Sequence, residues 1–156
     1  MTVGLLFIWD EGWFTPYAEL TLWHDLAVAF KVDLLIMVPN LKVYNFQDIK
    51  FEKYDTVEEA LNAHPELVKV FLEPRSIAKK CDVPVVPLEL FKHPENALYI
   101  FGNSGRSNIG LFRFEKGQLV VSVDTPKPTQ IWSIQVASIV LYDRLLKSVR
   151  KKWQAR

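Results

Sequence analysis

The stretch that decides the fold reads ALYIFGNSGRSN at 97–108, LVVSVDTP at 119–126 and QIWSIQVASIVLYDRLL at 130–146. Its first part predicts a buried strand that stops at Gly102, where a turn of small polar residues begins. Its second part predicts another strand that leads into a second turn, and its third part predicts an apolar helix. Ligands of open α/β sheets bind at the carboxyl ends of strands. The two turns are therefore the candidate site.

The first 40 residues have the pattern of one β-α-β unit. The apolar run from Val3 to Trp9 is typical of a strand buried on both faces, and Leu34 to Val38 is a second run of this kind. Between them, Tyr17 to Phe30 carries apolar side chains at helical spacing. Such a unit implies a parallel strand pair joined by a right-handed crossover.

Shorter elements are expected between this unit and the deciding stretch. The sequence predicts a strand near a sheet edge at 48–54, a helix at 57–62, a strand at 66–72 and a helical turn at 76–81. Thr56 and Glu59 have the spacing of a capping box at the start of the helix. Residues 82–95 hold three prolines and are expected to form an extended connector. A closing helix is expected from about 129 to 149, with an apolar stripe at Ile131, Ile134, Ile139, Tyr142, Leu145 and Leu146.

These elements add up to five or six strands alternating with helices in one α/β domain that spans residues 1–156. Apolar residues make up 49% of the chain, which indicates a globular protein, and the net charge of +1 predicts no strong overall attraction to nucleic acid. One cysteine, Cys81, and three scattered histidines predict neither an internal disulfide nor a metal site. No basic leader precedes the first strand, and no apolar run approaches the ~20 residues of a membrane span. A cytoplasmic protein without a membrane partner is expected.

Charge is concentrated at the end of the chain. Residues 144–156 carry six cationic side chains and no acidic one. A basic helix end of this kind can contact phosphates. It can equally be a solvated helix end whose cations are favourably placed at the negative pole of the helix dipole.

The segment ENALYIFGNSGRSN resembles motif 2 of the SPOUT superfamily, in its SpoU/TrmH-like branch of RNA methyltransferases. Motif 2 is an apolar strand followed by Phe-Gly, an acidic residue and a glycine. The segment VVSVDTPKPTQIWSIQVASIVLYDRLL resembles motif 3, in which a strand ends in a Pro-containing turn and a helix of the type LNVSVAAGIVLYDRL follows. HDLAVAFKVDLLIMV has the outline of motif 1, so the resemblance covers nearly the whole chain.

The resemblance implies a trefoil-knotted α/β fold with a parallel sheet, helices on both faces and assembly into a homodimer. It also implies S-adenosylmethionine as the cofactor and tRNA or rRNA as the substrate, commonly at a ribose 2′-hydroxyl. Asn103 and Arg106, in the turn of motif 2, are the candidate catalytic residues. Carried over by position, the candidate cofactor-binding residues are Phe101, Gly102, Asn103, Val123, Thr125, Trp132 and Ser133.

Motif 1 is where this sequence departs from the family. Active ribose methylases of the family carry an Asn and, six residues later, an Arg, whereas the corresponding positions here are Glu19 and Asp25. A carboxylate cannot do the electrostatic work of a guanidinium beside a phosphate. The motif 1 glycine is Lys31, and the motif 2 acid is absent. Three explanations stay open: a binding role without catalysis, another arginine (Arg106 first, or Arg75), or a target atom that needs less activation.

Two functions follow as hypotheses. The first is an S-adenosylmethionine-dependent RNA methyltransferase, and the alternative is a catalytically inactive SPOUT-fold dimer that binds RNA or a protein. A doubly wound α/β protein for some other nucleotide ranks last, because neither the dinucleotide-binding glycine motif nor a P-loop motif occurs in the sequence.

Overall fold

A computed structural model describes residues 1–9, 16–80, 82–102, 118–127 and 131–155 of the chain. Strands and helices alternate along these residues, as the sequence predicts. The strands are β1 (Val3–Ile8), β2 (Leu34–Val38), β3 (Lys50–Lys53), β4 (Val68–Leu72), β5 (Val86–Pro87), β6 (Ala97–Phe101) and β7 (Leu119–Ser122). The helices are α1 (Pro16–Ala29), α2 (Val57–Asn62), α3 (Arg75–Lys80) and α4 (Ser133–Gln154), with a 3-10 turn η1 (Leu88–Leu90).

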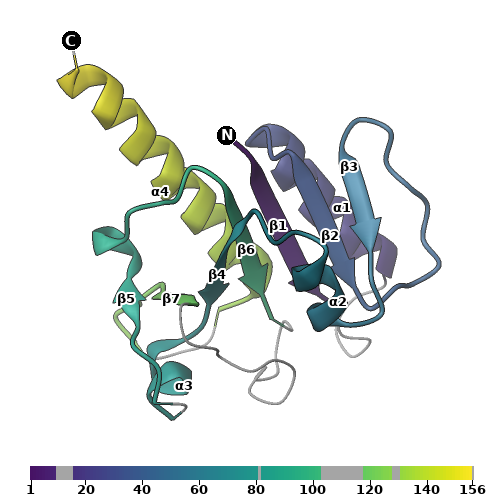
Figure 1. Ribbon diagram of the computed structural model, residues 1–156, viewed down its shortest axis with the longest axis horizontal. Helices are drawn as coiled ribbons and strands as arrows, with labels where there is room; N and C mark the ends of the chain where they lie inside the picture. Colours follow the sequence, from purple (N-terminus) through teal and green to yellow (C-terminus); the bar gives the residue numbers. More distant parts are fainter. Residues whose placement is uncertain (10–15, 81, 103–117, 128–130, 156) are drawn as a thin grey trace.

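The described strands form one seven-stranded sheet in the order β3-β2-β1-β6-β4-β7-β5, and every pair within it is parallel (Figure 1). β6 lies at the centre, where Tyr99 is in register with Leu5 of β1 on one side and with Val70 of β4 on the other. All five residues of β6 are buried. A strand that is buried on both faces and paired on both edges sets the positions of the neighbouring strands.

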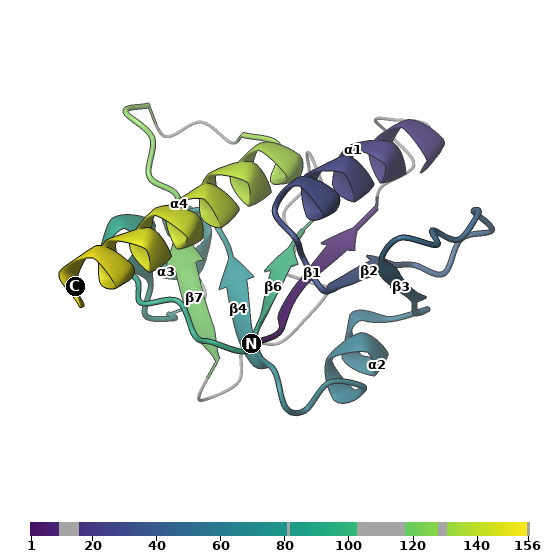
Figure 2. The ribbon, with the colours of Figure 1, turned by 90° about the horizontal axis from the view of Figure 1, so that it is seen from above.

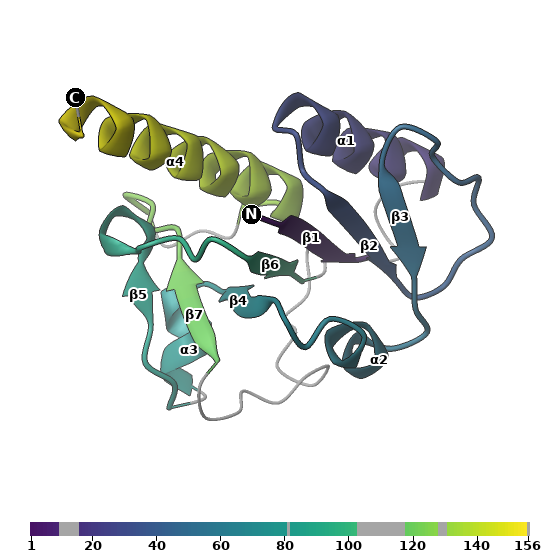
Figure 3. The same ribbon diagram turned by 45° about the horizontal axis from the view of Figure 1, so that its top comes forward.

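The sheet has helices on both faces, as Figures 2 and 3 show. α1 and α4 lie over one face, and α2 and α3 lie over the other. Alternate residues of the strands contribute to the two layers: Leu5 and Phe7 belong to the core under α1 and α4, whereas Leu6 and Ile8 belong to the core over α2 and α3. This alternation is the period of two that strand geometry imposes.

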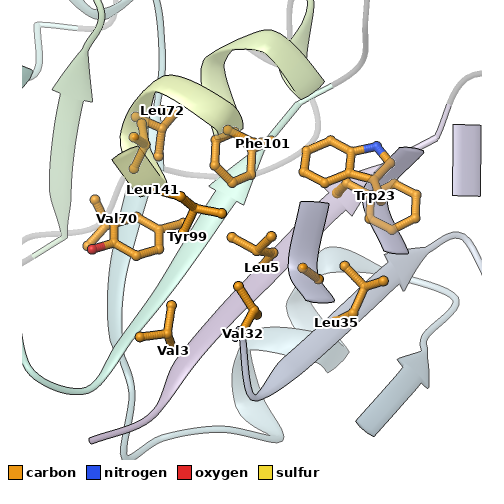
Figure 4. Close-up of a cluster of buried hydrophobic side chains, with 14 of the residues drawn as sticks. Val3, Leu5, Trp23, Val32, Leu35, Val70, Leu72, Tyr99, Phe101 and Leu141 are labelled. Atoms are coloured by element: carbon orange, nitrogen blue, oxygen red, sulfur yellow. The ribbon is translucent and has the colours of Figure 1, made fainter. Parts of the chain in front are cut away.

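Trp23 of α1 fills the centre of the larger core (Figure 4). Its side chain is 0% exposed, and its ring stacks on Phe7 of β1 with centroids 4.8 Å apart. The Trp23 ring also lies 5.4 Å from the ring of Phe101, at the end of β6. The aromatic side chains therefore fasten α1 to the two central strands by apolar burial.

The structure confirms most of the expected elements and corrects three expectations. The described sheet has seven strands, not five or six, because the connector at 82–95 contains β5 and η1. β5 is two residues long, includes Pro87 and lies at the sheet edge, which is where a strand tolerates proline. The closing helix begins at Ser133, later than expected, and continues to Gln154.

The third correction concerns the apolar stripe of α4. Ala137, Val140 and Leu141 are buried, and the expected stripe residue Ile134 packs against the same core, whereas the expected Ile139, Tyr142, Leu145 and Leu146 are exposed. α4 carries apolar side chains on two faces, so helical spacing alone does not identify the face that meets the sheet. Within the described residues no helix is both long and apolar enough to cross a membrane.

The central position of Trp23 predicts a large effect on stability. Trp23→Ala should lower the free energy of unfolding by about 3–5 kcal/mol, because it removes a fully buried ring and leaves a cavity against Phe7 and Phe101. Its neighbour Leu22 is 45% exposed, and Leu22→Ala should change the same quantity by less than about 1 kcal/mol. Urea denaturation followed by circular dichroism measures both. Equal effects of the two substitutions would contradict this account of the core.

Candidate functional site

Three strand ends that are far apart in the sequence meet at the carboxyl edge of the sheet. Glu73 follows β4, Gly102 follows β6, and Val123 follows β7. The backbone N–H of Glu73 donates to the carbonyl oxygen of Val121 at 3.1 Å, which ties the end of β4 to β7. Parallel pairing thus brings the two turns predicted from the sequence to one edge, with the end of β4 between them.

The first turn of α4 is joined directly to the end of β6. The hydroxyl of Ser133 donates to the carbonyl oxygen of Gly102 at 2.6 Å, across 31 residues of sequence. The side-chain oxygen of Gln135 accepts from the backbone N–H of Trp132 at 3.0 Å, which satisfies one of the free donors at the helix start. Gly102 and Ser133, both predicted to bind the cofactor, therefore lie together. Phe101 contributes only backbone at this edge, because its side chain is buried in the core.

Arg75 and Asp124 form an ion pair beside this junction. The Nη2 of Arg75 lies 2.6 Å from Oδ2 of Asp124, and its Nε lies 3.4 Å from Oδ1. The hydrogen bond from Arg75 lowers the pKa of the Asp124 carboxyl below its ordinary value. Both side chains are partly exposed, so the pair contributes little to stability. Arg75 was one alternative source of a catalytic guanidinium, and the structure places it against a carboxylate.

A groove of about 470 Å³ opens between the end of β7, η1 and α4. That volume lies in the range of small-ligand sites. Its walls are mainly apolar, from Leu88, Val123, Ile139 and Leu146, while its acidic groups are Glu89, Asp124 and Asp143. Of the predicted cofactor residues that the structure describes, Val123 is the one that lines it. Asp124 is paired with Arg75, and Asp143 with Lys147 at 2.7 Å, so the groove offers a ligand mainly its apolar walls.

Asp143 is held in the groove wall by a hydrogen-bonded chain. Nε2 of His93 lies 2.8 Å from Asp143 Oδ2, and Nδ1 of His93 lies 2.6 Å from the hydroxyl of Tyr99. Nη1 of Arg144 donates to the same hydroxyl at 2.9 Å, which leaves the Tyr99 proton for Nδ1 of His93. Burial lowers the pKa of His93, so the ring is neutral and donates from Nε2 to Asp143. The chain fixes α4 against the connector before β6.

The remaining predicted site residues have different positions. The hydroxyl of Thr125 donates to the carbonyl of Lys127, so it is used within its own turn. Trp132 is half-buried at the start of α4. Asn103 and Arg106 lie outside the described residues. The sequence patterns did not indicate that Glu89, Asp124 and Asp143 belong to the site. A polar residue inside the apolar helix pattern was the only signal for Asp143, and nothing local marked the other two.

The two motif 1 positions lie on different faces of α1. Glu19 is buried in the first turn, and Nε1 of Trp23 donates to its carboxylate at 3.4 Å. Asp25 is exposed, and its Oδ1 lies 3.1 Å from Nδ1 of the neighbouring His24. Glu19 is therefore part of the layer between α1 and the core, whereas Asp25 belongs to a surface cluster.

His24 links α1 to the segment before β3. Its Nε2 lies 2.8 and 3.0 Å from the two carboxylate oxygens of Asp48, and its ring stacks on Phe46 with centroids 4.1 Å apart. Because both ring nitrogens face carboxylates, the ring is protonated when both contacts are made. Burial lowers the pKa of His24, but the hydrogen bonds to Asp48 and Asp25 outweigh it, so the pKa is raised above 6.5. We call this arrangement of His24, Asp25 and Asp48 the His24 clamp.

Among the residues that the structure describes, no group of three or more His, Cys, Asp or Glu side chains is arranged to hold a metal ion. The described part of the candidate site consists of backbone groups, apolar walls and carboxylates.

Comparison with known proteins places the fold. No family model matches the sequence, and no curated protein matches it. Solved structures do match. One is the SpoU methyltransferase AviRb from Streptomyces viridochromogenes in complex with AdoMet, with a TM-score of 0.70 and 14% identity over 96% of this chain and 61% of that one. Another, an RNA 2′-O ribose methyltransferase, has a TM-score of 0.70 and 15% identity over 95% of this chain and 57% of that one.

A third structure concerns the 2-OH methylation of C/U34 on tRNA. It has a TM-score of 0.68 and 13% identity, over 96% of this chain and 92% of that one. At these identities the likeness establishes the fold, which is that of the SpoU/TrmH-type methyltransferases. The resemblance that the motifs suggested is thus confirmed at the level of structure.

The His24 clamp predicts a measurable pH dependence. Because the folded pKa is raised, the clamp is fully formed below pH 6.5 and is lost as the pH rises through the folded pKa. In an NMR titration of the ring protons, His24 should titrate above 6.5. Asp48→Asn should lower that pKa, since it removes the main hydrogen-bonding carboxylate. Asp55→Asn, at an exposed acid with no contact to His24 among the described residues, should leave it unchanged. A wild-type pKa below 6.5 would refute the clamp.

Proposed function

We propose that this chain is an S-adenosylmethionine-dependent RNA methyltransferase of the SpoU/TrmH-like branch, acting on tRNA or rRNA at a ribose 2′-hydroxyl. The observation that carries the proposal is the hydrogen bond of Ser133 to Gly102 at the carboxyl edge of the sheet, the edge at which Val123 also follows its strand and lines the groove. These are three of the positions at which the motif resemblance places the cofactor. The shared fold supports the proposal, since AviRb was crystallised with AdoMet in that fold.

The trefoil knot is part of the same proposal. β7 follows β6 in the sequence, yet it pairs with β4 on the side away from β6. α4 then returns to the end of β6 at Gly102. This path of the chain is compatible with the proposed knot, in which the C-terminal part passes through a loop and departs from the usual rule of unthreaded connections.

The residues at this edge fit the proposed cofactor. Backbone groups near Gly102 and the apolar wall at Val123 suit a neutral adenine. When bound, the cofactor supplies an electrophilic methyl group. The chain positions the two reactants, and Ser133 and Gly102 hold the helix start in place for that purpose. Arg106 and Asn103 stay proposed as the residues that act on the target hydroxyl.

A non-catalytic role is the second candidate, and one observation favours it. Where active ribose methylases have Asn and Arg, this chain has Glu19, which is buried against Trp23, and Asp25, which belongs to the His24 clamp. Neither carboxylate is placed to activate a hydroxyl as a guanidinium would. In that case the chain is a SPOUT-fold dimer that binds RNA or a protein. Incorporation of label from methyl-labelled S-adenosylmethionine into RNA distinguishes the two functions.

The homodimer belongs to both candidates. Ile139, Tyr142, Leu146 and Val149 are between 39% and 55% exposed and recur every three or four residues on the outer face of α4. This is the spacing of a helix-pairing seam. A second copy of the chain that covers this face would remove a contiguous apolar strip from water.

Cofactor binding is the direct test of the methyltransferase proposal. Calorimetry should detect S-adenosylmethionine or S-adenosylhomocysteine binding to the wild-type chain. Ser133→Ala should weaken that binding about fivefold, because it removes the hydrogen bond that holds the start of α4 at Gly102. Ser148→Ala is the matched control, since the Ser148 hydroxyl donates within its own helix to Leu145. No heat at millimolar ligand with folded protein would exclude a cofactor-dependent function.

The dimer proposal has a matched pair of variants. Val149 on α4 and Val68 at the start of β4 are both 41% exposed. Val149→Glu should convert a dimer into a monomer, because it places a charge in the proposed interface, whereas Val68→Glu should leave the dimer intact. Light scattering after size-exclusion chromatography gives the mass of each. A monomeric wild-type chain would overturn the proposal.

A further inference from the structure

The last turns of α4 extend beyond the sheet that the rest of the helix covers (Figure 1). α4 has 22 residues, so it is about 33 Å long. Its buried residues are Ala137, Val140 and Leu141, all in its first half. Its second half is fastened by Arg144 and Lys147, and the turns that follow are exposed to solvent.

The cations of α4 fall into two groups. Arg144 donates to the carbonyls of Pro94 and Glu95, and Lys147 donates to the carbonyls of Leu88 and Phe91, so both are used inside the fold. Arg150, Lys151 and Lys152 are exposed, and their side chains make no hydrogen bond or ion pair with the residues that the structure describes. No acidic residue follows Asp143 in the sequence. We call residues 150–153 the basic arm.

Trp153 completes the basic arm. Its side chain is 74% exposed, and it is the one large apolar side chain between Arg150 and Ala155. The helix dipole accounts for cations at a C-terminus but not for an exposed indole beside them, and Trp153 follows the last residue of the proposed dimer face, Val149, by four residues. Cations that track a phosphate backbone, together with an aromatic ring on which a base can stack, are the recurring pair of groups on single-stranded nucleic-acid surfaces.

We propose that the basic arm binds RNA, with Arg150, Lys151 and Lys152 neutralising phosphates and Trp153 stacking on an unpaired base. The proposal rests on the proposed function for the class of partner, and it adds a second RNA contact. A membrane surface fits less well, because an interfacial helix needs a broad apolar face, and the exposed apolar strip of α4 belongs to the proposed dimer interface.

The geometry gives the RNA a minimum length. The arm lies at the opposite end of α4 from Ser133, which is bonded to Gly102 at the candidate site. An RNA that reaches both must span about 30 Å, the length of roughly nine successive phosphates at the ~3.4 Å axial spacing of a duplex strand. The arm should therefore strengthen binding of a tRNA-sized molecule and have no effect on a trinucleotide.

Salt-dependent RNA affinity tests the phosphate contacts. The affinity for labelled tRNA is measured by fluorescence anisotropy at several salt concentrations. For the triple variant Arg150→Gln, Lys151→Gln, Lys152→Gln, the negative slope of log association constant against log salt concentration should become shallower by about 2 to 3. At 0.1 M salt this is a loss of about 100- to 1,000-fold if the affinities converge at 1 M. The matched control removes three other exposed cations, in Lys42→Gln, Lys79→Gln, Lys80→Gln, and should keep the wild-type slope.

The stacking contact has its own variants. Trp153→Ala should weaken binding of the same RNA about tenfold with an unchanged salt slope, and Trp153→Phe should restore most of the loss. Circular dichroism of each variant checks that α4 keeps its helicity.

The outcomes separate this proposal from the proposed function. Two results would refute RNA binding by the basic arm and leave the proposed function intact. One is an equal salt dependence of RNA affinity in the two triple variants, and the other is binding of the arm to anionic vesicles in preference to RNA. A fall in helicity with unchanged RNA affinity would show that the cations serve only the helix dipole. A wild-type chain that binds S-adenosylmethionine but no RNA would overturn the RNA partner together with the arm.

Discussion

Strand β6 is the element on which the rest of the structure depends. It is paired on one edge with β1 and on the other with β4, and all its residues are buried. Its backbone hydrogen bonds therefore join β1, at the start of the chain, to β4 in the middle of the chain. The same strand delivers Gly102 to the edge of the sheet, where the Ser133 hydroxyl meets it. Because the Gly102 carbonyl directly follows a rigid central strand, its position is well fixed, and a site that includes it is held rigidly as well.

α4 serves two surfaces because apolar side chains occur on both of its faces. Ala137, Val140 and Leu141 are small or medium in size and allow the helix to lie close to the sheet. Ile139 and Tyr142 are exposed on the outer face and form one wall of the groove. Polar contacts from His93, Arg144 and Lys147 set the rotation of the helix, since each can be satisfied only when the outer face is turned to the groove.

Local features of the chain could be predicted from the sequence, and long-range choices could not. The limits of β2 and α2, and the capping of α2 by Thr56, follow from spacing over a few residues, and the structure confirms them. The groove was not predictable, because Asp143 finds His93 across 50 residues of sequence. Of the predicted apolar stripe of α4, Ile134 packs against the core and four residues are exposed, since both faces of the helix are apolar. The carboxylate at Asp25 gave a clear departure from the motif, but its contact with His24 and, through that ring, with Asp48 became visible only in three dimensions.

The pairing of β1 with β6 also sets an order of events during synthesis. Val3 is in register with Ala97, so the inner edge of β1 has no partner until most of the chain has left the ribosome. An apolar strand with open backbone groups is prone to pair with other chains while it waits. α1 can cover one face of β1 early, through Trp23 and Phe7, but a helix cannot satisfy a strand edge. The centre of this sheet is therefore assembled late, from segments of high contact order, and a slow-folding nascent chain is the consequence.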